Sequence, residues 1–270
     1  MTAPASFLIA QLSDVHIRGK GERYKDIVDS NRMFSEAIEH LHALDRKPDL
    51  VILTGDLVDY GHANEYANAV ELLSALTIPY LVMAGNHDSR EQLRAAFASH
   101  RYLPPQGPLH YCIDDHPLRV VALDSTVPAM HHGAIDQPQL DWLRATLSAN
   151  RLKPTIVLLH HPPFVSGIPY LDNYNYPAHN ALAAVLGEFS NIEAVFCGHV
   201  HRTMIKRWAG TVVCACPSTT TQIALQLAAR AQPMSYGGPA ACMLHYWTAM
   251  DGLVSHVSYV GDYPGPYPFF

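Results

Sequence analysis

The stretch Pro79-Tyr80-Leu81-Val82-Met83-Ala84-Gly85-Asn86-His87-Asp88 decides the fold class of this chain. Its apolar first part has the length of a strand, and it leads directly into a turn that carries an amide, an imidazole and a carboxylate. In an open α/β sheet, ligands bind outside the carboxyl ends of the strands, so polar side chains at this position indicate a site. Gly85 suits a close approach of backbone and ligand, because glycine tolerates dihedrals that other residues do not.

Other apolar runs along the chain end in the same kind of polar cluster. Runs of this kind, nearly continuous in apolar residues, are typical of strands that are covered on both faces. They occupy residues 7–12 before Asp14 and His16, 50–54 before Asp56, 155–159 before His160 and His161, and 193–197 before His199 and His201.

The segments between these runs are predicted to be helices. Apolar residues recur at three- and four-residue spacing near 30–45, 64–76, 90–100 and 180–189. Asp29 or Ser30 is expected to cap the first helix, and Asp136-Gln137-Pro138 to open another. The order strand–helix–strand–helix–strand predicts a parallel sheet with right-handed crossovers.

Three further segments have weaker patterns. Two strands are expected between 110 and 124, around the turn Asp114-Asp115-His116-Pro117, and a helix-like piece near 222–231. Residues 164–180 form a long loop rich in Tyr, Asn and Pro, which is typical of a lid or of a contact between subunits. The sequence leaves these two interpretations of the loop open.

The overall composition excludes several classes of protein. Of 270 residues 49% are hydrophobic and 16% charged, as expected of a globular chain. The formal net charge is -6 with only 18 Lys and Arg residues, so we expect no nucleic-acid polymer as a partner. Five cysteines without a Cys-x-x-Cys pair argue against a disulfide framework and a thiolate zinc site. We find no signal peptide and no apolar stretch of the ~18 residues that cross a membrane, and therefore expect a soluble, cytoplasmic protein.

The polar residues at the strand ends are typical metal ligands. Asp, Asn and His without thiolates suit Mn, Fe, Co or Zn rather than a structural zinc site. There are more candidates than one ion with an open position for water requires, so they suggest two ions that share a carboxylate. Two metals about 3.5–4 Å apart recur in enzymes that displace groups at phosphorus. Residues two apart in extended backbone share a face, so Asp14 and His16 are expected to converge on one ion.

Taken together, the strand ends resemble the ordered motifs of the calcineurin-like metallophosphoesterases. The neighbouring residues are similar to bacterial glycerophosphodiesterases and class III cyclic-nucleotide phosphodiesterases of that superfamily. This resemblance implies a four-layer α/β/β/α sandwich, formed as a single domain over residues 1–270, with a small cap or oligomerisation element within 217–245. The motifs are Asp14-x-His16, Gly55-Asp56, Gly85-Asn86-His87-Asp88, His160-x-Pro162 and Gly198-His199-x-His201.

The resemblance also implies two divalent metal ions and a role for each motif residue. His87 would contact the phosphoryl oxygens or the leaving group without binding metal. The family pattern His-x-Pro selects His160 as a ligand, which leaves His161 with a role in binding substrate, in supporting the ligands or in packing. One ion would be held by Asp14, His16, Asp56 and His201, and the other by Asp56, Asn86, His160 and His199, with Asp56 bridging.

These residues predict a phosphodiesterase that acts on small phosphodiesters, either glycerophosphodiesters or cyclic nucleotides. A metal-bound water would lose a proton near neutral pH and attack phosphorus in line, while both ions neutralise the developing charge. The alternatives are a phosphomonoesterase or nucleotide pyrophosphohydrolase with the same centre, and a non-catalytic scaffold. The intact ligand set argues against the scaffold. The few nearby cations, Arg18 and Arg202, mildly favour a monoanionic diester over a dianionic monoester.

Several other polar residues are expected to be structural. Asp88 is interpreted as a helix cap or a partner of the ligands, and Asp124 as a hydrogen-bonding residue because no His accompanies it. Because relatives in the resembled group are often dimers or larger, we expect a homo-oligomer. Surface or structural positions are also expected for the histidines outside the strand-end pattern, which are His110, His116, His131, His132 and His179.

Overall fold

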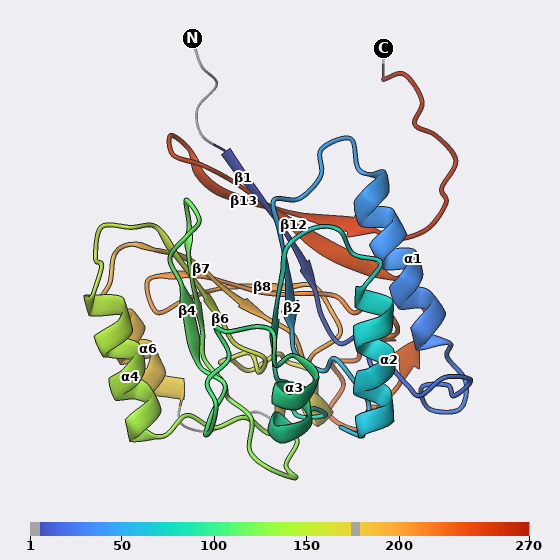
Figure 1. Cartoon of the computed structure of the whole chain (residues 1–270), viewed down its shortest axis with the longest axis horizontal. Coiled ribbons are helices and arrows are strands. Elements are labelled where there is room, and N and C mark those ends of the chain that lie inside the picture. Colours follow the sequence, from blue (N-terminus) through green and yellow to red (C-terminus); the bar gives the residue numbers. More distant parts are fainter. Residues whose placement is uncertain (1–5, 174–178, 270) are drawn as a thin grey trace.

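The computed structural model describes residues 6–173 and 179–269 and shows two sheets stacked between two layers of helices (Figure 1). One sheet contains, in spatial order, β13 (Gly252–Tyr259), β12 (Ala241–Thr248), β1 (Ser6–Leu12), β2 (Leu50–Thr54) and β3 (Tyr80–Met83). The other contains β4 (Tyr111–Ile113), β5 (Arg119–Ala122), β6 (Thr155–Leu158), β7 (Ile192–Cys197), β9 (Thr211–Ala215) and β8 (Met204–Trp208).

The helices form the two outer layers of the molecule. On the side of the first sheet lie α1 (Ser30–Ala43), α2 (Ala63–Leu73) and α3 (Arg90–Ala96), and on the side of the second lie α4 (Gln137–Ser148) and α6 (His179–Leu186) (Figure 1). A short helix, α5 (Pro169–Asp172), and a small pair of strands, β10 (Gln222–Ile223) and β11 (Ser235–Tyr236), complete the elements of the described ranges. The layers therefore follow the predicted α/β/β/α order.

The strand pairing confirms the predicted parallel sheet. Strand β1 pairs in parallel with β2, and β2 with β3. The two strands predicted between 110 and 124 are the antiparallel pair β4 and β5, in which Tyr111 lies opposite Ala122. The C-terminal third of the chain returns to the first sheet, where β12 pairs antiparallel with β1 and β13 with β12.

Two of the predicted helix starts are confirmed by their caps. The carboxylate of Asp29 accepts a hydrogen bond from the Arg32 amide (3.1 Å), so Asp29 rather than Ser30 caps α1. The carboxylate of Asp136 accepts from the Gln139 amide (2.9 Å), and the Gln139 side chain accepts in return from the Asp136 amide (2.7 Å). Each such cap contributes about 1 kcal/mol.

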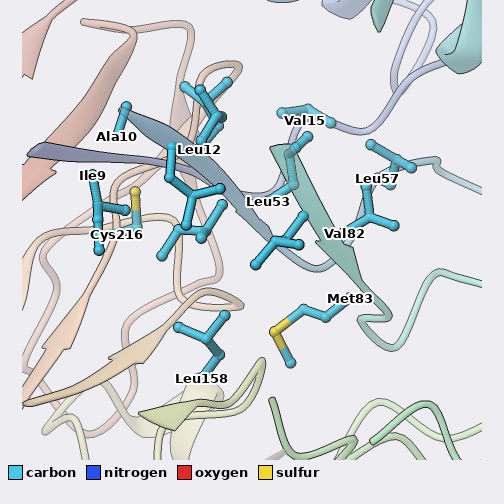
Figure 2. Close-up of a cluster of buried hydrophobic side chains, with 14 of the residues drawn as sticks. Ile9, Ala10, Leu12, Val15, Leu53, Leu57, Val82, Met83, Leu158 and Cys216 are labelled. Carbon is cyan, nitrogen blue, oxygen red and sulfur yellow. The ribbon is translucent and has the colours of Figure 1, made fainter. Parts of the chain in front are cut away.

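The space between the two sheets is filled by apolar side chains. Ile9 from β1 and Leu158 from β6 are fully buried there, and Leu12, on the opposite face of β1, belongs to the same continuous cluster (Figure 2). Burial of each side chain of this size contributes about 1.5–3 kcal/mol. Because both faces of the central strands are covered, these strands read as continuous apolar runs in the sequence. The core thus fixes where the strands end, and with them the polar clusters.

The predicted helical piece near 222–231 is wrong. Gln222 and Ile223 instead form β10 and pair with β11. The backbone of Ile223 is also held by two hydrogen bonds, from its amide to the His201 carbonyl and from the Arg202 guanidinium to its carbonyl. Leu225 and Leu227, which would have formed the apolar face, are 59% and 62% exposed. Tertiary contacts therefore override the local helix propensity of this segment.

The loop predicted at 164–180 lies only partly within the described residues. Its first part contains α5, whereas 174–178 fall outside those ranges, so the lid stays a prediction. The cap or oligomerisation element expected within 217–245 also stays a prediction; β10 and β11 lie in that range. Over residues 6–173 and 179–269, every helix is too short or too polar to span a bilayer.

Candidate metal centre

The ends of β1, β2, β3, β6 and β7 bring the predicted ligands to one edge of the molecule, where several of them line a cavity of about 280 Å³. Within each of several groups, the potential ligand atoms lie within 4.8 Å of one another. These groups are Asp14, His16 and His201; Asp14, Asp56 and His160; His16, Asp56 and His87; and His160, His161 and His199.

The backbone at this edge is strained. Asp14 and His16 converge as predicted, but the predicted cause, an extended backbone, is wrong. Strand β1 ends at Leu12, and both residues adopt positive φ, 53° and 45°. Left-handed backbone costs on the order of 1–3 kcal/mol at each non-glycine residue and is concentrated at functional sites. The same conformation occurs at Asp56 (50°), His199 (70°) and His201 (45°).

On one side of the centre, two imidazoles face each other. Nε2 of His16 lies 3.1 Å from Nε2 of His201, and Oδ1 of Asp14 lies 3.5 Å from the latter atom. Nδ1 of His201 donates to the carbonyl of Thr221 (3.0 Å), which leaves Nε2 as an acceptor. Nδ1 of His16 lies 3.5 Å from a carboxylate oxygen of Asp59, which favours the proton on Nδ1 and leaves a lone pair on Nε2. Two facing lone pairs and a carboxylate are a donor set that fits a cation.

The other side of the centre repeats this arrangement with an amide. Oδ1 of Asn86 lies 3.1 Å from Nε2 of His160 and 2.8 Å from Nδ1 of His199. Nδ1 of His160 donates to the carbonyl of Thr54 (2.8 Å), so Nε2 is the ring nitrogen that presents a lone pair beside the Asn86 oxygen once a cation displaces its proton. Nε2 of His199 is buried and has no hydrogen-bond partner among the described residues. This second group of acceptors also fits a cation.

Asp56 lies between the two sides. Its Oδ2 is 3.9 Å from Nε2 of His16 and 3.4 Å from Nε2 of His160. Its Oδ1 accepts a hydrogen bond from the His87 amide (2.9 Å), which fixes the orientation of the carboxylate. One oxygen is therefore held by the backbone and the other faces both groups of ligands.

Two glycines make this packing possible. A Cβ atom at Gly85 would lie 2.2 Å from Oδ1 of Asp56, so Gly85 admits a candidate metal ligand, whereas the predicted approach of its backbone to a bound ligand stays a prediction. A Cβ at Gly55 would lie 2.4 Å from Nδ1 of His160, and its φ of 94° favours glycine as well. Any larger residue at either position would displace a candidate ligand.

The charges of the centre are strongly coupled. Burial raises the pKa of Asp14 to about 7, and burial together with the positive charge of His160 lowers the pKa of His199 to about 3. Burial opposes ionisation of Asp56 as well, but His160 and His87 hold its pKa well below the usual range. Burial lowers the pKa of His160, but the negative charge of Asp56 outweighs this and raises it to about 9. Metal binding displaces protons from such ligands, so protons and cations are expected to compete here.

His87 lies on the wall of the cavity, as expected for a residue that contacts substrate. Its Nδ1 donates to the carbonyl of Asp59 (2.7 Å), and the Asp59 carboxylate lies 3.4 Å away. Burial lowers its pKa, but the charge of Asp56 and the hydrogen bonds to Asp59 raise it to about 10. The ring is 28% exposed.

His161 is placed differently from His160. It is fully buried, is absent from the cavity wall, and its Nδ1 lies 2.8 Å from Oγ of Ser125. Its ring also hydrogen-bonds the backbone of His131. This geometry therefore favours a role for His161 in holding the loop of His131 over contact with substrate.

The sequence missed three residues of the site. Asp59 orients His16 and His87, and Tyr24 stacks on His16 with ring centroids 4.5 Å apart. His131, expected to be structural, lines the cavity, and its Nδ1 lies 3.3 Å from Nδ2 of Asn86. The spacing Asp56-x-x-Asp59 was a readable signal for Asp59, whereas nothing in the sequence singled out Tyr24 or His131.

Other expectations are confirmed as structural contacts. The Asp88 carboxylate accepts from the amides of Leu57 (3.1 Å) and Gly85 (2.8 Å). Asp124 pairs with the Arg90 guanidinium (2.6 Å) and accepts from the Leu109 amide (2.8 Å). The ring of His110 stacks on Trp142, and that of His116 on Phe7.

The two cations nearest to the motifs are engaged elsewhere. The Arg18 guanidinium pairs with Glu65, Asp59 and Glu22, and that of Arg202 donates to the Ile223 carbonyl. Neither cation is among the residues that line the cavity.

Comparisons with known proteins agree with this geometry. The sequence profile of the calcineurin-like phosphoesterases matches residues 7–203. A probable glycerophosphodiester phosphodiesterase GpdQ of Arcobacter nitrofigilis is 36% identical over 264 residues, which is 97% of each chain. A probable cyclic nucleotide phosphodiesterase of Rhodococcus erythropolis is 35% identical and covers 80% of this chain and 71% of the relative. The structure is similar to a dimetal phosphatase from Danio rerio (TM-score 0.63, 15% identity, 96% of this chain and 100% of the other), which shows a shared fold.

Proposed function

The chain belongs to the calcineurin-like phosphoesterases, and on this premise we propose that it hydrolyses small phosphodiesters at a centre of two divalent metal ions. The observation that carries the proposal is the pair of facing acceptor groups with Asp56 between them. One group is formed by Asp14, His16 and His201, and the other by Asn86, His160 and His199.

We assign Asp56 as the shared ligand because a single oxygen faces both groups. Nitrogen and oxygen donors without thiolates suit Mn, Fe, Co or Zn. The assignment agrees with the second hydrogen bond that fixes each imidazole: the Thr221 carbonyl orients His201 and the Thr54 carbonyl orients His160. Such partners fix the tautomer of metal-binding histidines.

The chemistry divides between the ions and the side chains. When bound, two such ions supply a nucleophile from water near neutral pH and neutralise charge at phosphorus. When both of its ring nitrogens are protonated, His87 on the cavity wall donates a hydrogen bond to a phosphoryl oxygen or to the departing alkoxide. Asp59 holds the His87 ring in place for this task.

Few cationic side chains lie around the cavity. Arg18 and Arg202, the cations nearest to the motifs, are bonded to other groups of the chain. Lys25, however, lines the cavity and lies over the Tyr24 ring, so a dianionic monoester could draw on Lys25 and His87 as well as on the ions. The relatives named as phosphodiesterases therefore carry the preference for phosphodiesterase activity over phosphomonoesterase or pyrophosphohydrolase activity. The complete ligand set argues against a non-catalytic scaffold.

Glycerophosphodiesters are the first candidate substrates, because the relative named for them matches 97% of this chain. Cyclic nucleotides are the second, because part of the cavity lining is apolar. The base of a nucleotide would pack on that part, which includes Tyr170, Leu171, Ile223 and Met234.

We also propose a cytoplasmic homo-oligomer. All five cysteines are free, in agreement with a reducing compartment. Leu225, Leu227, Met234 and Tyr236 are each more than half exposed on or next to β10 and β11, where a subunit contact would cover them.

The function is tested by initial rates on protein loaded with Mn²⁺, with a chromogenic phosphodiester and its monoester, and with a chelator-treated control. We expect metal-dependent cleavage of the diester well above that of the monoester. The comparison is then extended to glycerophosphoethanolamine and cyclic AMP. Dominant monoester cleavage would overturn the diesterase assignment, and no metal-dependent turnover of any of these compounds would overturn catalysis.

A further inference from the structure

The two candidate ion sites draw their ligands from both sheets. Asp14 and Asp56 follow β1 and β2 of the first sheet, whereas His160 and His199 follow β6 and β7 of the second. The distances between these side chains therefore depend on how the two sheets are placed relative to each other. Apolar side chains fill the space between the sheets (Figure 2). The hydrophobic effect that holds them together is non-directional, so it does not by itself fix the placement of one sheet on the other.

A small group of buried polar side chains, centred on Gln11, lies within this apolar layer. Gln11 of β1 is fully buried and lies three residues before Asp14. Its amide nitrogen donates to Oγ1 of Thr54 (2.9 Å) and to the carbonyl of Cys197 (3.0 Å). Thr54 is the last residue of β2, and Cys197 the last residue of β7 in the other sheet.

These bonds join the strands just before the ligands begin. Thr54 lies two residues before Asp56, and its carbonyl accepts from Nδ1 of the candidate ligand His160. Cys197 lies two residues before His199. A single side chain thus ties together the strands that lead to Asp14, Asp56 and His199.

A buried histidine completes the network. Because the amide nitrogen of Gln11 donates to a carbonyl, its Oε1 must be the acceptor toward Nε2 of His245 (3.0 Å). Nε2 of His245 therefore carries the proton, and Nδ1 accepts from the Ser255 hydroxyl (2.7 Å). The ring of His245 also stacks on Phe196 of β7, with ring centroids 3.7 Å apart. His245 thus contacts both sheets as well.

From these contacts we infer that Gln11 and His245 are positioning residues for the metal centre: their hydrogen bonds set the registry of the two sheets and thereby the spacing of the ligands. The inference rests on the proposed function, since it requires that the centre binds metal. Hydrogen bonds are directional and costly to leave unmade in a core, so they specify one arrangement where apolar contacts allow several.

The test measures binding of Mn²⁺ to the full chain by calorimetric titration, without substrate. Gln11→Met keeps the approximate size of the side chain and removes its hydrogen bonds. We expect its affinity for Mn²⁺ to fall about 10- to 100-fold, the range seen when the partners of metal ligands are removed. The matched control is Asn191→Leu. The Asn191 amide nitrogen donates to the Lys153 carbonyl (2.7 Å) and to Thr155 Oγ1 (3.3 Å), and so joins the starts of β6 and β7. These contacts lie at the ends of the strands opposite to the metal centre.

A second pair of variants isolates the bond between His245 and Gln11. His245→Gln retains a donor near the position of Nε2, whereas His245→Leu does not, and both lose the stacking on Phe196. We expect His245→Gln to bind Mn²⁺ more tightly than His245→Leu. This comparison keeps the inference testable if Gln11→Met does not fold.

The outcomes separate the two proposals. A wild-type chain that binds no Mn²⁺ would overturn the proposed function. Normal Mn²⁺ affinity in Gln11→Met would overturn the positioning role alone. The same follows if Asn191→Leu, at an equal drop in melting temperature, loses as much affinity for Mn²⁺ as Gln11→Met. Equal affinities of the two His245 variants would do the same.

Discussion

The candidate metal centre and the core beneath it are both buried, yet they are built in opposite ways. Leu12 and Asp14 are two residues apart and neither is exposed to solvent. Leu12 ends a regular strand and packs among apolar side chains, whereas Asp14 has left-handed backbone and faces another carboxylate and several imidazoles. Burial of apolar surface in the core stabilises the folded chain, whereas backbone strain and desolvated charge in the centre destabilise it.

This difference explains how the chain tolerates its own site. The strained residues follow β1, β2 and β7, each of which is paired with a strand on either side, so the surrounding structure holds them in place. A protein of this design should lose function and stability separately when the two regions are altered. The predictions below test that separation, from the largest expected effect to the smallest.

Asp56→Asn should have the largest effect, because it removes the charge that faces both groups of ligands. Asn also tolerates the left-handed backbone at this position, so the fold is expected to persist. Metal content should fall at both sites and turnover by roughly 10³-fold or more, the scale of losing a preorganised electrostatic group. Elemental analysis after dialysis and initial rates check this. Wild-type turnover with full metal content would refute the shared-ligand assignment.

Ile9→Ala should affect the other region alone. Ile9 is fully buried between the sheets (Figure 2), and truncation of such a residue costs about 2–5 kcal/mol in the free energy of unfolding. Denaturant titration measures the loss. Metal content and turnover of the folded variant should stay near wild type; a large loss of either at little cost in stability would show that core and centre are not separable.

His87→Ala should lower the rate and spare the metal. The His87 ring lines the cavity and acts on the substrate in our proposal, so turnover should fall about 10²-fold or more, as for other positioned proton donors. The matched control is His110→Ala, a histidine that stacks on Trp142 outside the cavity wall. Loss of metal together with rate in His87→Ala would instead make His87 a ligand.

Per pH unit, His245 should produce the smallest effect, a dependence of stability on pH. Burial, with a contribution from His256, lowers its pKa from 6.5 to about 3. Between these values the unfolded chain binds a proton that the folded chain does not, so stability from this residue is complete above pH 6.5 and falls as the pH is lowered. The slope is at most about 1.4 kcal/mol per pH unit.

The check is denaturant titration of wild type and His245→Gln between pH 7 and pH 4. The difference in unfolding free energy between the two proteins should narrow as the pH falls, because glutamine does not titrate. A constant difference across this range would show that His245 is equally protonated in the folded and unfolded chains.

Much of the core was predictable from the sequence because one physical rule governs it. Strands covered on both faces must be apolar throughout, so β1, β2 and β7 could be read directly, and the polar residues after them marked the edge where a site forms. Gly85 could be interpreted in advance as a point of close approach, and the structure places Asp56 against it.

The rest of the site depends on contacts that no local pattern encodes. Asp14 and His16 converge through left-handed turns rather than through strand alternation. His131 reaches Asn86 from a distant loop, and the segment after Thr221 forms a strand because its backbone bonds His201 and Arg202. Each of these features is set by tertiary partners, which the periodicity of a single segment cannot reveal.

The most direct test of this account is the number of metal ions that the chain binds. The wild-type protein is dialysed against Mn²⁺, freed of excess metal and assayed by elemental analysis, beside Asp56→Asn treated in the same way. We expect two ions per chain in the wild type and a loss at both sites in the variant. One ion or none in the wild type, or two in Asp56→Asn, would contradict a dinuclear centre organised around Asp56.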